Sequence, residues 1–195
     1  MARTSHVKRS TSETQIEVRL NLDGTGIQDI QTPVPFLDHM LSQLSRHGYF
    51  DLTVKAQGDT QIDSHHTVED VGIAVGQAFK EALGDKKGIR RFAEASVPLN
   101  EALAQCIIDI SGRAFFVFNL ELPKAKLGDF DVELVPEFFQ AFSANSGMTL
   151  HLNSPYWNNL HHITEALFKS FARALDSACT LDSRSGDVPS TKGTL

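Results

Sequence analysis

Cysteine is scarce in this sequence. Its 195 residues include two cysteines, Cys106 and Cys179, and their spacing matches no metal-binding motif. A framework of disulfides is therefore not expected, and both cysteines should be buried and reduced. Any metal site would have to use nitrogen and oxygen ligands instead of thiolates.

Long apolar segments and an excess of positive charge are also absent. No apolar run approaches the length that crosses a bilayer, and residues 1–15 lack the apolar middle of a secretory signal. We therefore expect a cytoplasmic location and no membrane partner. The formal net charge of −6 argues against nucleic acid as a general partner. These absences favour a small molecule as the ligand.

The residues that are present suffice for a sizeable core. Hydrophobic residues make up 41% of the chain and charged residues 22%, which fits one domain or two small fused domains. Alternating and helical spacings of apolar residues predict strands and helices in turn along both halves. Helices are predicted over residues 36–48, 64–85, 132–147 and 158–178, and strands within 14–26, 50–59, 101–112, 114–122 and 148–153. We expect Asp63 or Ser64 to cap the helix over 64–85, and an asparagine to cap the last helix.

The two halves of the sequence repeat the same order of elements. Each half contains the pattern HHxxE at the start of its last predicted helix, beginning at His65 in the first half and at His161 in the second. The agreement in element order and in the place of the motif indicates an internal duplication. We expect an α+β fold of two similar halves, over residues 7–92 and 93–182.

The HHxxE motif has the spacing of a metal site. Residues three and four apart share a helix face, so Glu69 can converge with His65 and His66, and Glu165 with His161 and His162. Adjacent imidazoles point about 100° apart, so each histidine of a pair can serve a different ion. This pattern predicts a dinuclear site for an ion such as Mn, Fe, Co or Zn. His39 lies where it could reach the same cluster, and its counterpart in the second half is Glu137.

Other interpretations of the motif remain open at this point. The histidine pairs could be surface residues at helix N-termini, with glutamates that complement the helix dipole. Two copies at equivalent points of a repeat, in a chain of eight histidines, argue against that interpretation. A dinuclear metallohydrolase that activates water is a second alternative. A non-catalytic metal-binding or shell-forming protein, whose histidines cross-link subunits, is a third.

Seven segments of the sequence resemble a known family over nearly the whole chain. They are PFLDHML, DSHHTVEDVGIAVGQA, ALGDKKGIRRFA, DISGRA, GMTLH, HHITEALFKSFARAL and PSTKG. The sequence resembles the imidazoleglycerol-phosphate dehydratases, metal-dependent hydro-lyases of histidine biosynthesis. The resemblance implies two Mn(II) ions per active site, with ligands His39, His65, His66, Glu69, Glu137, His161, His162 and Glu165. Several members of the family have histidine where this chain has Glu137.

The resemblance also implies the reaction, which is dehydration of imidazole glycerol phosphate to imidazole acetol phosphate. The route runs through a metal-bound imidazolate and a diazafulvene-like intermediate, with the metals as template and Lewis acid. The candidate catalytic carboxylates are Glu165, Glu13 and Glu69; we favour Glu165 as the base and Glu13 for positioning the substrate hydroxyls. The implied substrate contacts are Glu13, Arg91, Arg113, Lys169, Ser190, Thr191 and Lys192.

The family's fold and assembly follow from the same resemblance. Each half would form a four-stranded sheet with helices on one face, as in the second domain of ribosomal protein S5. The chain would act as a single functional domain over residues 1–195, with a tail over 183–195 that orders over the bound substrate. The family assembles into a homo-oligomer of 24 subunits with active sites between neighbouring chains.

Overall fold

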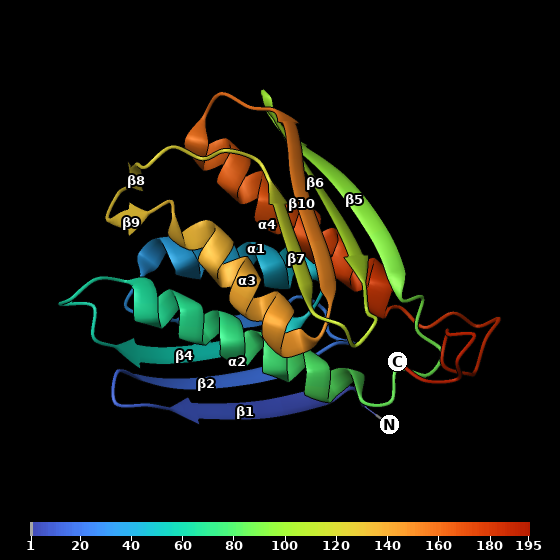
Figure 1. The fold of residues 1–195 in the computed structure, drawn as a ribbon. Coiled ribbons are helices and arrows are strands. Elements are labelled where there is room, and N and C mark those ends of the chain that lie inside the picture. Colours follow the sequence, from blue (N-terminus) through green and yellow to red (C-terminus); the bar gives the residue numbers. More distant parts are fainter. Residues whose placement is uncertain (1) are drawn as a thin grey trace.

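The computed structural model describes residues 2–195 and contains two four-stranded sheets (Figure 1). The first half comprises β1 (Thr4–Ser10), β2 (Thr14–Asn21), β3 (Gln28–Gln31), α1 (Pro35–Gly48), β4 (Asp51–Gly58) and α2 (His65–Leu83). Its strands lie in the order β1-β2-β4-β3, antiparallel except for the parallel pair of β3 and β4. In β2 the side chains of Ile16, Val18 and Leu20 are buried under the helices, as the alternating pattern predicts.

The second half repeats this arrangement. It comprises β5 (Phe92–Leu99), β6 (Ala102–Asp109), β7 (Phe115–Asn119), β8 (Lys126–Leu127), β9 (Phe130–Asp131), α3 (Leu134–Ser146), β10 (Thr149–Tyr156) and α4 (Leu160–Cys179). The sheet order β5-β6-β10-β7 matches that of the first half, and β7 is parallel to β10 as β3 is to β4. The short pair of β8 and β9 is an addition to the repeat. The expected α+β duplication is therefore confirmed.

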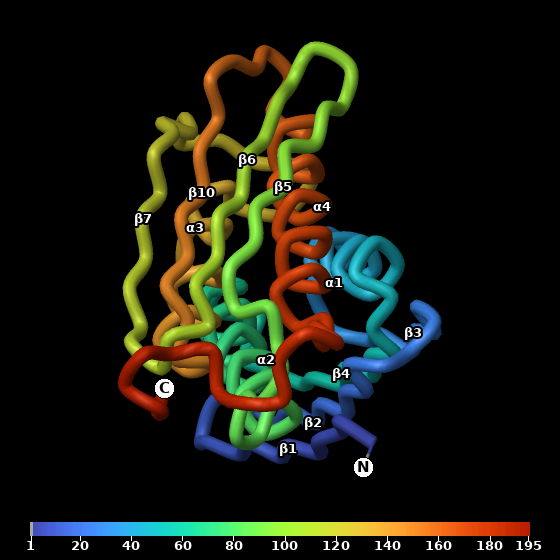
Figure 2. Tube along the Cα trace, turned by 90° about the vertical axis from the view of Figure 1, so that its right-hand side faces the viewer, coloured from blue at the N-terminus to red at the C-terminus, as the bar shows by residue number. Residues whose placement is uncertain are grey.

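The helices lie between the two sheets (Figures 1 and 2). α2 packs on β1 and β2 and also against α3, while α4 packs on β5 and β6 and also against α1. Aromatic rings cross this layer edge to face, from Phe79 to Phe142 (5.6 Å between centroids) and from Phe142 to Phe171 (4.9 Å). The buried side chains of the two halves therefore form one continuous hydrophobic cluster.

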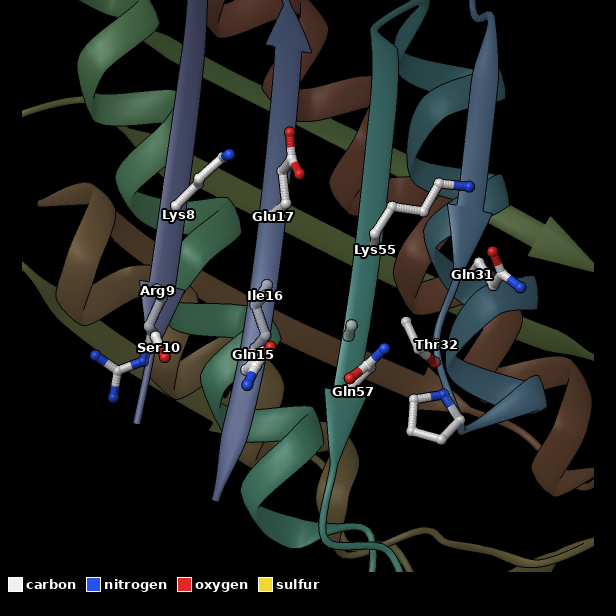
Figure 3. Close-up of a pocket in the computed structure, with 12 residues that line it drawn as sticks. Lys8, Arg9, Ser10, Gln15, Ile16, Glu17, Gln31, Thr32, Lys55 and Gln57 are labelled. Carbon is white, nitrogen blue, oxygen red and sulfur yellow. The ribbon is translucent and has the colours of Figure 1, made fainter. Parts of the chain in front are cut away.

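The outer faces of the two sheets differ in polarity. Lys8, Glu17 and Lys55 lie at register positions opposite one another on β1, β2 and β4. They line a groove of about 650 Å³ on the outer face of the first sheet (Figure 3). None of the predicted site residues lines this groove. The second sheet instead exposes Phe92, Ile107 and Phe115, of which Phe115 is 63% exposed.

Two expectations from composition can be compared with the structure directly. Cys106 and Cys179 are buried and form no disulfide, and burial raises the pKa of the Cys179 thiol to about 12. Within residues 2–195, none of the helices combines the length and the apolar character that a membrane span needs.

Candidate functional site

Both histidine pairs lie in the first turn of a helix, where local hydrogen bonds fix the backbone. The side chain of Asn159 caps α4 by accepting hydrogen bonds from the backbone N–H groups of His161 and His162, as expected. In α2 the N-cap residue is Ser64, but its side chain makes no capping bond. Asp63 accepts from the backbone N–H of His65 instead, at 2.7 Å.

The first group of potential metal ligands combines residues from both repeats. His39 of α1 and His161 of α4 each place Nε2 near the same carboxylate oxygen of Glu165, at 3.2 and 3.1 Å. The ligand atoms of these three residues all lie within 4.8 Å of one another. The group borders a cavity of about 550 Å³ that is also lined by Phe36 and Phe130. Helical spacing predicted that His161 and Glu165 converge, and the packing of α1 against α4 brings His39 to them.

Glu165 lies in a strongly cationic setting for a carboxylate. Its side chain is 14% exposed, and Lys169, one turn further along α4, places Nζ 2.6 Å from Oε1. Burial raises the pKa of Glu165, but hydrogen bonds from Lys169 and His39 outweigh this effect and lower it to about 2. The carboxylate is therefore ionised and suited to hold a cation. Lys169, predicted to contact substrate, lies beside this group.

The second group of potential ligands belongs to the first repeat. It consists of His66, Glu13 and Asp59, and His66 Nδ1 lies 3.0 Å from Asp59 Oδ2 and 3.8 Å from Glu13 Oε2. The hydrogen bond to Asp59 raises the pKa of His66 above its usual value. Glu13 and His66 were predicted site residues, whereas Asp59 was not.

The remaining predicted ligands lie less close to one another. His65 Nε2 is 4.0 Å from Glu69 Oε2, and His162 Nδ1 is 2.9 Å from Oε2 of Glu101, a second residue that the sequence did not identify. Among residues 2–195, neither group of potential ligands includes Glu137, which lies in the first turn of α3. The role of Glu137 as a ligand stays a prediction.

The predicted arginines and tail residues meet in a different part of the molecule from Lys169. Arg91, Arg113 and the tail residues Ser190, Thr191 and Lys192 line one cavity of about 590 Å³, together with Phe92 and Pro189. Arg91 forms a two-pronged ion pair with Asp109, at 2.7 and 3.2 Å, and donates to the carbonyl of Pro189 at 2.7 Å. The tail is thus held against the arginine by its backbone, and the cavity offers several donors to an anion.

His161 and Glu165 of the first group lie in the first two turns of α4, and Arg91 of the cationic cavity is held near the other end of this helix, whose course Figure 1 shows. The backbone N–H of Arg91 donates to the carbonyl of Ala178 at 3.0 Å. Ala178 comes 16 residues after His162 in the sequence, which corresponds to roughly 24 Å along the helix axis. Within a single chain, the potential metal ligands on α4 therefore lie too far from the potential anion site for one small substrate.

Comparison with known proteins decides the family. A sequence model of the imidazoleglycerol-phosphate dehydratases matches residues 32–175. The chain belongs to the imidazoleglycerol-phosphate dehydratase family. It is 58% identical, over all 195 residues and the full length of both chains, to the imidazoleglycerol-phosphate dehydratase of Trichlorobacter lovleyi. The same identity holds over the full length of the Geobacter sulfurreducens protein of that name. The resemblance seen in the sequence is thereby confirmed.

Solved structures of the family agree with the fold. The crystal structure of imidazoleglycerol-phosphate dehydratase from Staphylococcus aureus matches with a TM-score of 0.83 at 39% identity, over 92% of this chain and 99% of that one. The Pyrococcus furiosus structure matches with a TM-score of 0.84 at 32% identity, over 97% and 100% of the two chains. Dehydratases are hydro-lyases, so family membership makes this chain an enzyme of that class, in histidine biosynthesis.

Proposed function

We propose that the chain is a Mn(II)-dependent enzyme that dehydrates imidazole glycerol phosphate to imidazole acetol phosphate. The observation that carries the proposal is the group of His39, His161 and Glu165, in which two repeats contribute two imidazoles and a carboxylate to one point. Family membership supports the reaction, because the relatives are named for it.

The donor atoms of the histidine groups fit a divalent cation. Imidazole nitrogen combined with carboxylate oxygen, without thiolate, suits Mn(II) among other ions. We propose two ions per active site with the ligands His39, His65, His66, Glu69, Glu137, His161, His162 and Glu165. Bound Mn(II) would supply a template and a Lewis acid for the imidazole ring of the substrate.

The three candidate catalytic carboxylates, Glu165, Glu13 and Glu69, differ in burial and in their contacts. A general base works best when its pKa lies near the working pH, and the pKa of about 2 makes Glu165 better suited to hold a cation than to accept a proton. Glu13 and Glu69 have side chains about half exposed, at 49% and 47%. The candidates for the base are Glu165, Glu13 and Glu69, and we propose that Glu13 also orients the substrate hydroxyls.

The cationic cavity would bind the phosphate group of the substrate. The guanidinium of Arg91 matches phosphate in shape, and Asp109 holds it in one orientation. Arg113 and Lys192 add charge, and Ser190 and Thr191 add hydroxyl and backbone donors. Closure of residues 183–195 over the phosphate stays a prediction.

We further propose that each active site forms between subunits. The separation of the ligands on α4 from the cationic cavity within one chain supports this arrangement, because a neighbouring chain can supply the missing half. The exposed apolar side chains on the second sheet, Phe92, Ile107 and Phe115, offer a surface for self-association. Assembly into 24 subunits and a cytoplasmic location stay predictions.

Turnover of imidazole glycerol phosphate tests the proposal. Metal-stripped protein should form no ketone product, and addition of Mn(II) should restore it. A metal-loaded, assembled sample that leaves the substrate unchanged would refute the proposal. Metal-dependent hydrolysis of phosphoesters or amides without dehydration would favour a metallohydrolase instead.

A matched pair of histidine variants makes the test specific. His161→Ala should abolish turnover, because it removes one imidazole from the group around Glu165. His6→Ala should retain full turnover, although His6 Nε2 also contacts a carboxylate, that of Glu17, at 2.8 Å. His6 lies in β1 on the polar outer face of the first sheet. Equal losses in the two variants would argue against a metal role for the HHxxE histidines.

A further inference from the structure

The second histidine of each HHxxE motif is held by a carboxylate that the proposed function does not use. Nδ1 of His66 lies 3.0 Å from Asp59, and Nδ1 of His162 lies 2.9 Å from Glu101. The first histidine of the second motif, His161, uses the other ring nitrogen, Nε2, for its contact with Glu165. The two members of that pair therefore face their carboxylates with different nitrogens.

The two carboxylates come from different places in the repeat. Asp59 directly follows β4, and the residue that directly follows the equivalent strand β10 is Trp157. Glu101 lies just before β6, and its counterpart before β2 is Glu13, which is 3.8 Å from His66 Nδ1. The two halves thus use different loops to supply the closest carboxylate, but in both halves this carboxylate contacts Nδ1 of the second histidine. Because different loops give the same contact, we infer that the second histidine needs a carboxylate at Nδ1.

The chemistry of imidazole explains such a requirement. A neutral ring carries one N–H, and a carboxylate at Nδ1 accepts the hydrogen bond that keeps the proton there. The lone pair of Nε2 is then free for a metal, and the ring is fixed in orientation. In the described part of the chain, no hydrogen bond occupies Nε2 of His66 or of His162.

We propose that Asp59 and Glu101 are positioning residues, which fix His66 and His162 as Nδ1–H tautomers and so direct Nε2 of each ring toward a metal ion. The proposal rests on the metal site of the proposed function. The side chains of Asp59 and Glu101 are 14% and 38% exposed, so the hydrogen bond of His66 is the better shielded of the two. Asp59 should accordingly have the larger effect.

The tautomers can be measured without any metal. ¹⁵N spectra of histidine-labelled, metal-free protein, at a pH above the imidazole pKa, distinguish protonated from unprotonated Nδ1. His66 and His162 should be Nδ1–H tautomers in the wild type. Asp59→Ala should shift His66 toward the Nε2–H form, and Glu101→Ala should do so for His162. Rings that carry the proton on Nε2 in the wild type would overturn the proposal.

Mn(II) affinity is the second measurement, by calorimetric titration of the stripped protein. Loss of an outer carboxylate of this kind weakens metal binding by about 10–100-fold, and we expect this range for Asp59→Ala. Asp59→Asn should recover most of the affinity, because the amide oxygen still accepts from Nδ1–H. Glu17→Ala, which removes the carboxylate beside His6, should change nothing.

Two outcomes of the titration would contradict positioning. Unchanged affinity in both alanine variants would mean that the carboxylates are dispensable. If Asp59→Asn lost Mn(II) as completely as His66→Ala, Asp59 would be a direct ligand. Failure of the wild type to bind Mn(II) at all would overturn the metal site itself, while the ¹⁵N spectra would still report whether the tautomers are fixed.

Discussion

At the scale of single residues, two buried threonines of the first half have opposite hydrogen-bonding situations. The hydroxyl of Thr14 donates to Asp70, which also pairs with Arg9 at 2.7 Å. The hydroxyl of Thr67, within the HHxxE motif of α2, is buried, and among residues 2–195 it finds no partner. It fills the space that the missing side chain of Gly58 leaves. A buried hydroxyl without a partner costs stability, whereas a bonded one contributes to it.

Valine substitutions at these two positions should therefore act in opposite directions. Thr67→Val keeps the shape and removes the unpaired hydroxyl, so the free energy of unfolding should stay the same or rise by about 1 kcal/mol. Thr14→Val removes one of the hydrogen-bond donors to Asp70, so it should lower the free energy of unfolding by about 1–3 kcal/mol. Urea unfolding of the metal-free variants gives both values. A clear loss of stability in Thr67→Val would show that its hydroxyl has a partner in solution.

The sequence predicted some residue-scale contacts and missed others for a physical reason. The convergence of His161 with Glu165 and the Asn159 cap depend on helical spacing within a few residues, which a sequence displays. The contacts of Asp59 and Glu101 depend on how loops close over the start of a helix. Glu101 is 61 residues away from His162 in the sequence, so no local pattern relates them.

At the scale of elements, α2 and α3 pack closely because α2 carries glycine at two positions one turn apart. A Cβ added at Gly72 would lie 2.7 Å from the carbonyl oxygen of Phe138, and one at Gly76 would lie 2.7 Å from that of Phe142. Both contacts are with backbone, which cannot rotate away. The glycines therefore set the distance between the two helices, although glycine lowers helix propensity by about 1 kcal/mol.

Gly76→Ala should destabilise the protein despite the better helix propensity of alanine. Forcing a methyl group into this contact must separate α2 from α3, and we expect a net loss of about 1–3 kcal/mol in the free energy of unfolding. Gly186→Ala is the control, since an added Cβ there meets nothing within 4 Å. Thermal unfolding of the two variants measures the difference. A Gly76→Ala protein more stable than the wild type would mean that the helices can move apart without cost.

Strands were harder to predict than helices, and edge strands were hardest. β1, β3 and β5 lie at sheet edges, and most of their side chains are exposed or half-buried, so they show little apolar alternation. The remaining edge strand, β7, was predicted from its run of apolar residues. Each helix buries a stripe of apolar side chains, and the helical spacing of these residues can be read in the sequence. The duplication could be recognised because the central strands and helices retain their patterns in both halves.

At the scale of the whole molecule, one chain separates its potential metal ligands on α4 from the cationic cavity that would bind a phosphate. The group of His39, His161 and Glu165 lies at the N-terminal end of α4, while the backbone of Arg91 bonds to Ala178 near its C-terminal end. Figure 2 shows the C-terminal tail continuing from that second end of α4. In an assembly of closed symmetry, a contact between one end of a chain and the opposite end of a neighbour is repeated once per subunit. Every active site would then contain parts of two chains.

Mixing two inactive variants tests this arrangement. His162→Ala removes a ligand at the histidine end, and Lys192→Ala, combined with Arg91→Ala, removes cations at the other end. Each protein alone should be inactive. The two variants are dissociated, mixed in equal amounts and reassembled. If sites form between chains, about a quarter of wild-type turnover should return. Random pairing leaves about half of the sites with an intact histidine end and about half of those with an intact cationic end. Reassembling His162→Ala with a second histidine-end variant, His161→Ala, should restore far less, because both parents lack the same half. Inactive mixtures of correctly assembled particles would mean that each chain completes its own site, despite the length of α4 between its two ends.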